Sequence, residues 1–188
     1  MTRPLAVPVS RADARAFVTR HHSHHWAPNT WLLSVGVEFG GSLVCVATLE
    51  LPKARMLCNG TTAEISRVCS DGTTKNAATV AIGALSRAAL ALGYRRLVSY
   101  LLLGERGTSY RAANWHPAAI SAGGKWDRPS RPAGNRETTQ VSAKVRWEYG
   151  PDAAPVDNDV LLAVNESVGK IELPGRVASE PLFSRCVA

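Results

Sequence analysis

The sequence of 188 residues lacks any long apolar stretch, and this absence is the first constraint on its class. No run of roughly 18 apolar residues occurs, so the sequence predicts no transmembrane helix. The N-terminal residues 1–4 do not begin the continuous apolar segment of a signal peptide. We therefore expect a cytoplasmic protein with no membrane partner, and its 45% apolar content suffices for a globular core.

Cysteine is scarce, and its spacing excludes common metal and redox motifs. The four cysteines, Cys45, Cys58, Cys69 and Cys186, form no CxxC pair. Cys45 and Cys69 fall inside predicted strands, which favours buried, reduced thiols over metal ligands or nucleophiles. The GxxxxGK[ST] pattern of a nucleotide-binding P-loop is also absent.

Acidic residues are few in residues 1–150, which hold 19 Lys and Arg against 9 Asp and Glu, a net charge of +10. Residues 151–188 hold 3 against 6, a net charge of −3, and contain no motif. We expect one domain over 1–150 and an acidic, partly ordered C-terminal arm over 151–188. The basic domain suits a polyanion or an anionic cofactor, and a soluble basic surface explains the charge equally well.

Hydrophobic periodicity predicts alternating strands and helices along the domain. A strand over 5–9 precedes a helix that Ser10 caps and that runs to His21. Segments 31–39 and 43–51 flank Gly40-Gly41 and predict a β-hairpin. Further strands are predicted over 62–69, 96–103 and 140–149, helices over 77–92 and 107–114, and irregular structure over 120–136.

The segment from Thr62 to Trp115 is the centre of the predicted fold. Its loop of small polar residues, Ser70 to Asn76, ends at a helix N-terminus, where unpaired N–H groups and the positive end of the helix dipole suit a phosphate. In the preceding strand, Glu64 and Arg67 are unusual charges, and a regular strand would turn them to opposite faces. They indicate either a strand edge that opens into a cleft or two solvated charges on a half-exposed strand.

Four histidines fall within the five residues His21 to His25. Imidazoles can bind a metal, or act as a general base near neutral pH. We favour catalysis or substrate contact over a metal, because no further Cys or His ligands follow at zinc spacings. A polar loop, with imidazoles that cap carbonyls or pack on Trp26, is the other interpretation.

The element order and the central segment resemble the GNAT acyltransferase superfamily. Tyr110-Arg111-Ala112-Ala113-Asn114-Trp115 is similar to the Tyr-x-x-x-Gly-Phe ending of that fold's fourth helix, with Asn and Trp in place of Gly and Phe. The loop over 70–78 departs from the family's Gln/Arg-x-x-Gly-x-Gly/Ala pattern. The resemblance implies an α/β (α+β) fold with a mixed, mostly antiparallel central sheet and helices on both faces.

More narrowly, three motifs resemble a group of phage and prophage proteins related to the Mom-type DNA-modification proteins, which have a GNAT-like fold and alter adenine in phage DNA. The motifs are the histidine cluster, the run from Glu64 to Gly72, and Gly-Lys-Trp-x-Arg-Pro-Ser-Arg-Pro over 124–132. In the last segment, cations can meet phosphates and a ring can stack on bases. The predicted nucleic-acid contacts are Lys125, Trp126, Arg128, Arg131 and Arg136. A solvated surface loop is the alternative.

The GNAT resemblance implies acetyl-CoA or another acyl-CoA as donor. The arm of the donor would pair with the backbone of Arg67, Val68 and Cys69, and its phosphates would lie on Gly72, Thr73, Thr74, Lys75 and Asn76. Tyr110 would be the general acid, unless it only packs on the sheet, and His22, His24 or Glu64 would take the proton from the accepting amine.

We therefore predict a GNAT-like acyltransferase that modifies an amino group on DNA, adenine among the options. The first alternative is an acetyl-CoA-dependent N-acetyltransferase of a small amine or a protein. The second is a non-catalytic nucleic-acid-binding protein on a GNAT-like frame. The sequence leaves the oligomeric state open, with a homodimer among the options.

Overall fold

The computed structural model describes residues 3–22, 27–122 and 142–168. None of the helices among these residues is long and apolar enough to cross a membrane. In chain order the elements are β1 (Leu5–Pro8), α1 (Arg11–His21), β2 (Leu33–Phe39), β3 (Ser42–Glu50), the 3-10 turn η1 (Arg55–Leu57), β4 (Thr62–Ser70), α2 (Ala77–Ala91), β5 (Arg96–Leu102), α3 (Thr108–Ala112), β6 (His116–Ser121), β7 (Lys144–Tyr149) and α4 (Asn158–Ser167).

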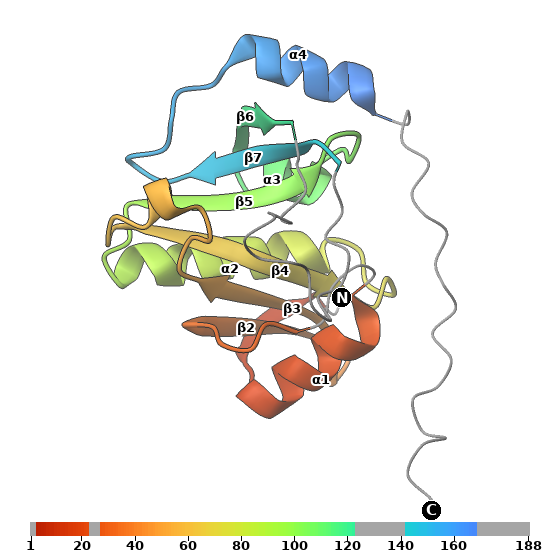
Figure 1. The fold of residues 1–188 in the computed structure, drawn as a ribbon. Coiled ribbons are helices and arrows are strands. Elements are labelled where there is room, and N and C mark those ends of the chain that lie inside the picture. The colour runs from red at the N-terminus through yellow and green to blue at the C-terminus, as the bar shows by residue number, and fades with distance from the viewer. Residues whose placement is uncertain (1–2, 23–26, 123–141, 169–188) are drawn as a thin grey trace, which may run out of the picture.

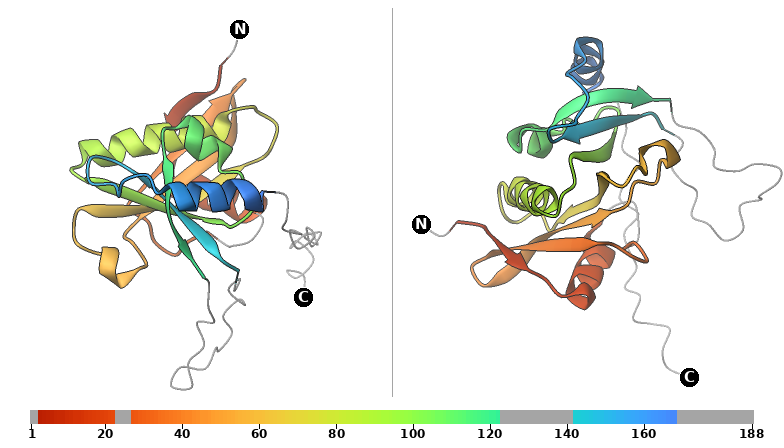
Figure 2. Two further views of the ribbon diagram at one scale, coloured as in Figure 1. Left: turned by 90° about the horizontal axis from the view of Figure 1, so that it is seen from above. Right: turned by 90° about the vertical axis from the view of Figure 1, so that its left-hand side faces the viewer.

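A seven-stranded sheet in the order β1-β2-β3-β4-β5-β7-β6 forms the centre of the molecule (Figure 1). Neighbouring strands are antiparallel except β4 and β5, which run parallel. α1 and α2 lie on opposite faces of the sheet, each over its own buried cluster (Figure 2). This confirms the predicted α/β (α+β) fold with a mixed, mostly antiparallel sheet and helices on both faces.

Local sequence explains where α1 begins and where α2 ends. Ser10 caps α1, because its Oγ accepts a hydrogen bond from the Asp13 backbone N–H at 3.1 Å. Small residues such as Ala81 let α2 lie close on the sheet, and Leu85 fills the space between them. The helix stops before Gly93, whose φ of 95° fits the position that follows a helix end.

The sequence does not predict β6. Its residues His-Pro-Ala-Ala-Ile-Ser have weak strand preference, and they form a strand because they pair with β7. The expected irregular structure over 120–136 is therefore wrong at Ile120 and Ser121, while 123–136 lies outside the described residues.

α4 forms within the predicted C-terminal arm, for which no element is expected from the sequence. Asp157 caps it by accepting hydrogen bonds from the N–H groups of Asp159 and Val160. Val164 is fully buried in the main core, so the apolar side of this short helix is what holds it on the sheet. Residues 169–188 lie outside the described part.

Candidate active site

The two parallel strands at the centre of the sheet pair over three residues and then separate. Residues 62–64 of β4 lie opposite residues 96–98 of β5. Beyond this point β4 stays paired with β3 up to Ser70, and β5 stays paired with β7 up to Leu102. Among the described residues, no strand therefore pairs with the second edge of β4 beyond Glu64. Such an edge can bind an extended ligand through its N–H and C=O groups.

A β-bulge lies where the strands separate. Neighbouring residues of β3 pair with Ile65 and Arg67, which leaves Ser66 as an extra residue. The expectation that Glu64 and Arg67 lie on opposite faces assumed a regular strand and is wrong. The extra residue shifts the alternation by one, so both side chains turn to the same face.

Glu64 occupies the last paired position before the separation, on the face turned away from α2. Its neighbours Ala63 and Ile65 belong to the cluster under α2, so alternation turns Glu64 the other way. The residue is 7% exposed, and its Oε2 accepts a hydrogen bond from the Lys53 backbone N–H at 2.9 Å. Burial raises the pKa of Glu64, although Lys53 opposes this, and the carboxylate is therefore a better base than an ordinary glutamate.

A second carboxylate, Glu50, is the cross-strand partner of Glu64. The Ser66 hydroxyl donates a hydrogen bond to Glu50, and Lys53 Nζ lies 3.5 Å from Glu50 Oε2. Like charges directly opposite on neighbouring strands repel each other. Lys53 reduces this cost by contacting both, with its backbone N–H on Glu64 and its ammonium on Glu50.

On the other face of the sheet, Tyr110 reaches the separation from α3. Its hydroxyl lies 2.7 Å from Ser99 Oγ, and the Ser99 hydroxyl donates to the Ile65 carbonyl at 2.8 Å. The Tyr110 ring packs against Trp115 and Trp147, with centroid distances of 5.4 and 6.0 Å. Burial raises the pKa of Tyr110 far above its ordinary value, so the phenol keeps its proton at neutral pH.

The residues around α3 that depart from the family pattern keep Tyr110 in place. Asn114, where the pattern has Gly, adopts a left-handed φ of 64°, which Asn tolerates better than most residues. Trp115 then turns into the core and donates its Nε1–H to Ser86 Oγ at 3.2 Å. Before the helix, Gly107 lies so close to Trp147 that a Cβ would come within 2.3 Å of the indole.

The predicted phosphate loop joins the end of β4 to the N-terminus of α2. Gly72 has a φ of 80° and open space around it, and Asn76 has a φ of 63° without capping the helix through its side chain. Among the described residues, the backbone N–H groups of Ala78 and Thr79 have no hydrogen-bond partner. Lys75 is exposed beside them. This end of α2 therefore offers donors and positive charge to an anion.

The same loop carries a carboxylate that opposes an anion. Asp71 Oδ1 accepts hydrogen bonds from both the backbone N–H and the hydroxyl of Thr73, at 2.9 and 2.8 Å. These bonds shape the loop, because they hold its backbone in a tight turn. They also place a negative charge in the loop that precedes α2.

Part of the predicted acceptor side lies within the described chain. His22 is the C-cap residue of α1, where its N–H donates to the Val18 carbonyl at 2.9 Å. α1 packs on the face of the sheet that carries Glu64. Outside the described residues lie His24 and all the predicted nucleic-acid contacts, Lys125, Trp126, Arg128, Arg131 and Arg136. Over residues 3–22, 27–122 and 142–168, no cluster of three or more His, Cys, Asp or Glu side chains could hold a metal ion.

Two thiols lie near the end of β4, beyond its pairing with β5. Cys45 and Cys69 are buried, and burial raises the pKa of each to about 12. Both therefore stay protonated and unreactive at neutral pH, as expected for structural thiols. Arg67, Val68 and Cys69 themselves fall within the part of β4 that continues beyond its pairing with β5.

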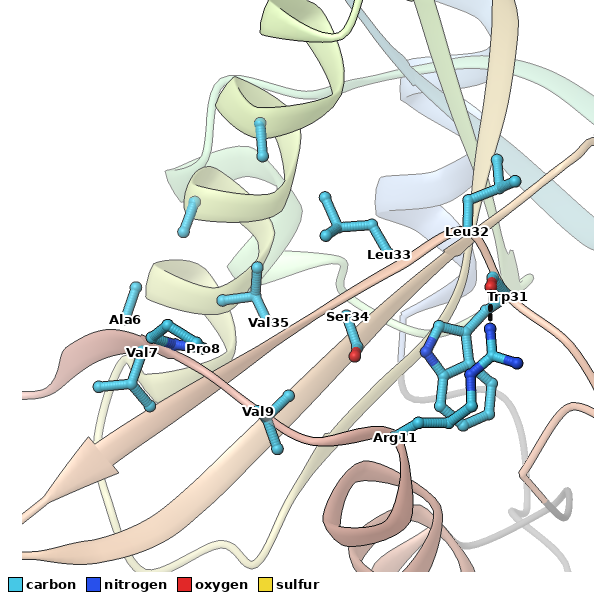
Figure 3. Close-up of a pocket in the computed structure, with 12 residues that line it drawn as sticks. Ala6, Val7, Pro8, Val9, Arg11, Trp31, Leu32, Leu33, Ser34 and Val35 are labelled. Atoms are coloured by element: carbon cyan, nitrogen blue, oxygen red, sulfur yellow. Dashed lines mark hydrogen bonds between the residues drawn. The ribbon is translucent and has the colours of Figure 1, made fainter.

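An apolar groove of about 550 Å³ lies elsewhere, between β1, β2 and α2 (Figure 3). Its larger polar side chains are Arg11 and Ser34, and the Arg11 guanidinium donates to the Trp31 carbonyl at 2.6 Å. The groove thus lacks the convergent polar groups that chemistry requires. The separation of β4 and β5 has them.

Sequence reasoning missed three polar residues of this site, Glu50, Ser66 and Ser99. Each is a polar residue within a strand that also contributes residues to the buried cluster under α2. The same signal singled out Glu64, because a buried polar group in a strand requires a partner or a function. It was available for all three.

Solved structures with a similar arrangement of elements include several acetyltransferases. An N-acetyltransferase from Staphylococcus aureus Mu50 shares 15% identity and a TM-score of 0.57 over 80% of this chain and 99% of its own. The ribosomal-protein-S18-alanine N-acetyltransferase from Escherichia coli shares 10% identity with a TM-score of 0.56, over 81% of this chain and 97% of its own. A Bacillus subtilis acetyltransferase, solved in complex with CoA, shares 11% identity with a TM-score of 0.53, over 80% of this chain and 99% of its own. In sequence, neither a family model nor a curated protein matches. The chain therefore has the GNAT fold.

Proposed function

We propose that the protein is an acyl-CoA-dependent N-acyltransferase, which moves an acyl group from a thioester to an amino group. The observation that carries this proposal is the separation of β4 and β5, with Glu64 on one face and Tyr110 on the other. Acyl transfer to an amine requires a base for the amine and a hydrogen-bond donor for the leaving thiolate. The two faces supply one each.

The residues present fit an acyl-CoA donor, acetyl-CoA included. The backbone of Arg67, Val68 and Cys69 would pair with its amide-containing arm, because this stretch of β4 continues beyond the pairing with β5. The loop over 72–76 and the α2 N-terminus would hold its phosphates. When bound, the donor supplies an electrophilic acyl carbon and a thiolate leaving group.

Glu64 is our first choice for the base that takes the proton from the amine. Its raised pKa and its place beside the separation suit this role, which is typically worth ~10²–10⁴ in rate. His22 or His24 is the other choice, and His22 ends the helix that packs on the same face. The hydrogen bond to the leaving thiolate would come from the side of Tyr110, whose phenol stays protonated.

For the acceptor we propose an amino group on DNA, with adenine as the first test. The net charge of +10 over residues 1–150 supports a polyanionic partner, as does the basic run with Trp126. A base inside a duplex cannot reach a site between two strands of a sheet. The proposal therefore implies base flipping or a single-stranded substrate.

The carboxylate pair Glu50 and Glu64 favours a second candidate acceptor, a cationic amine on a small molecule or a protein. Two carboxylates on one face attract an ammonium group and repel a phosphate. The two candidates share the donor and the chemistry, and they differ only in the group that approaches this face.

Two measurements test the proposal. Calorimetric titration of the purified protein with CoA, acetyl-CoA and longer acyl-CoAs should give binding, and no binding of any of them would overturn the choice of donor. Nucleosides from DNA of cells that express the protein, Glu64→Gln or His22→Ala should then be compared by mass spectrometry.

A new nucleoside made by the intact protein would establish DNA as acceptor, and its mass would identify the group. Loss in one variant alone would identify the base. Unmodified DNA, together with acetylation of polyamines or peptide amines in vitro, would establish the second candidate instead.

A further inference from the structure

Ser99 is the first residue of β5 beyond its last backbone pair with β4, and its side chain bridges the gap. Its hydroxyl donates to the Ile65 carbonyl across the separation, at 2.8 Å. On the other side of β5, Ser99 pairs with Trp147, which fixes its backbone. The residue is 3% exposed, so its hydroxyl requires partners within the protein.

The hydrogen-bond inventory fixes where the protons point. A serine hydroxyl has one proton, and a carbonyl oxygen can only accept. Because Ser99 gives its proton to Ile65, the 2.7 Å contact with Tyr110 must be a bond from the phenol to Ser99 Oγ. The Tyr110 proton is therefore directed at Ser99 and away from the open part of the separation.

We infer that Ser99 donates the hydrogen bond that the sulfur of the departing thiolate receives, and that Tyr110 is a positioning residue that acts through it. This inference rests on the proposed function. Turning the Ser99 hydroxyl from the Ile65 carbonyl to the sulfur leaves the bond from Tyr110 intact. That bond also polarises the Ser99 hydroxyl and strengthens its donation.

A direct bond from Tyr110 to the sulfur is the alternative, and each route gives up one observed hydrogen bond. The phenol ring is held against Trp115 and Trp147 and is 8% exposed, so its oxygen is fixed beside Ser99. If the Tyr110 hydroxyl turned toward the sulfur, it would lose its hydrogen bond to Ser99. In the role proposed for Ser99, no covalent bond of the protein forms or breaks, and the hydrogen bond stabilises charge on sulfur.

The test is the pH dependence of binding of CoA against desulfo-CoA, which lacks the thiol, by calorimetry on the full chain at pH 7 and pH 9. A thiol ionises near pH ~8.5, so a site that stabilises the thiolate binds CoA more tightly at pH 9. We expect a gain of ~10-fold for CoA, the usual size for a hydrogen bond to a charged group, and none for desulfo-CoA.

Ser99→Ala should lose this gain, and Tyr110→Phe should keep part of it. Ser99→Thr and Ser99→Val form a matched pair that differs only in the hydroxyl, so Thr should keep the gain and Val should lose it. Affinity for desulfo-CoA and the denaturation midpoint report whether each variant folds. If Ser99→Ala does not fold, the Thr and Val pair decides.

Each remaining outcome has a separate meaning. A gain that survives Ser99→Ala and disappears in Tyr110→Phe would make Tyr110 the direct donor and overturn the inference. Binding of CoA with no gain at pH 9 would overturn the inference and leave the proposed function standing. Absence of CoA binding at either pH would overturn the proposed function itself.

Discussion

Two buried glutamates, Glu64 and Glu148, flank Val98 in one cross-strand row of the sheet and are held in opposite ways. Glu148 is fully buried, and it accepts hydrogen bonds from the guanidinium groups of Arg96 and Arg146 and from the Ala154 backbone N–H. Burial opposes its charge, yet the hydrogen bonds and charges of these partners lower the pKa of Glu148. Its carboxylate is fully occupied by the protein.

Glu64 has much less support for its charge. A backbone N–H from Lys53 contacts its carboxylate, another carboxylate lies on the neighbouring strand, and burial raises its pKa. The contrast teaches how to separate two kinds of buried charge in one sheet. A buried carboxylate with several hydrogen-bond donors and cations around it holds strands together. One with fewer such partners is ready to accept a proton from a ligand.

Replacement of Glu64 by Gln tests the functional side of this comparison and should have the largest effect. We expect the acyl-transfer rate to fall by ~10²–10⁴, because the base is lost. The free energy of unfolding should not fall, since the Gln carbonyl can still accept from the Lys53 N–H. Steady-state rates with the acceptor found above, together with urea denaturation, measure both. An unchanged rate would remove Glu64 from the mechanism.

Replacement of Glu148 by Gln tests the structural side. Removing one partner of a buried ion pair typically costs ~3–5 kcal/mol, and we expect the lower end because both arginines are partly exposed. Urea denaturation measures the loss. Asp152→Asn is the matched control, since Asp152 forms a bidentate pair with Arg95 in solvent and should matter far less. Equal losses in the two variants would contradict the assignment.

The opposite pKa shifts predict opposite contributions to stability across pH. The pKa of Glu148 is lowered, so its contribution is present above pH 4.5, its unfolded value, and is lost as pH falls through the folded pKa. The pKa of Glu64 is raised, so its contribution is present below pH 4.5 and is lost as pH rises through the folded pKa.

The measurement is the free energy of unfolding between pH 3 and 8 for the wild type, Glu64→Gln and Glu148→Gln. Relative to the wild type, the Glu148 variant should lose less stability at low pH, and the Glu64 variant should gain stability as pH rises. Each unit of pKa shift corresponds to about 1.4 kcal/mol. Parallel curves for the three proteins would show that neither group titrates differently on folding.

Much of the fold could be predicted from local patterns. Alternation located β2 and β3, and the polar loop before a long Ala-rich helix located β4 and α2. β6 and α4 could not be found in this way. β6 forms through pairing with β7, a partner more than twenty residues away, and α4 is held by distant contacts, with Val164 buried in the core and Asn165 bonded to Arg111. Tertiary contacts decided both elements.

The site was predictable only residue by residue. Glu64 and Tyr110 could be named from strand position and family resemblance, but the links between them could not. A bulge at Ser66 brings Glu64 and Arg67 to one face, and no sequence pattern signals it. The hydrogen bond from Ser99 to Ile65 likewise exists only because the pairing of β5 with β4 ends at Val98, one residue before Ser99.

Asp71 extends the comparison to a third, half-buried carboxylate, and its removal should give the smallest effect. Asp71→Asn keeps an oxygen that can accept from Thr73 and removes a negative charge from the loop that precedes α2. We expect CoA to bind ~2–5-fold more tightly at low salt, with less gain at high salt, because exposed charges are screened. Lys75→Gln, which removes a nearby positive charge, is the control and should weaken binding. Calorimetry at two salt concentrations decides, and an Asp71→Asn affinity equal to the wild type at low salt would place the phosphates away from this loop.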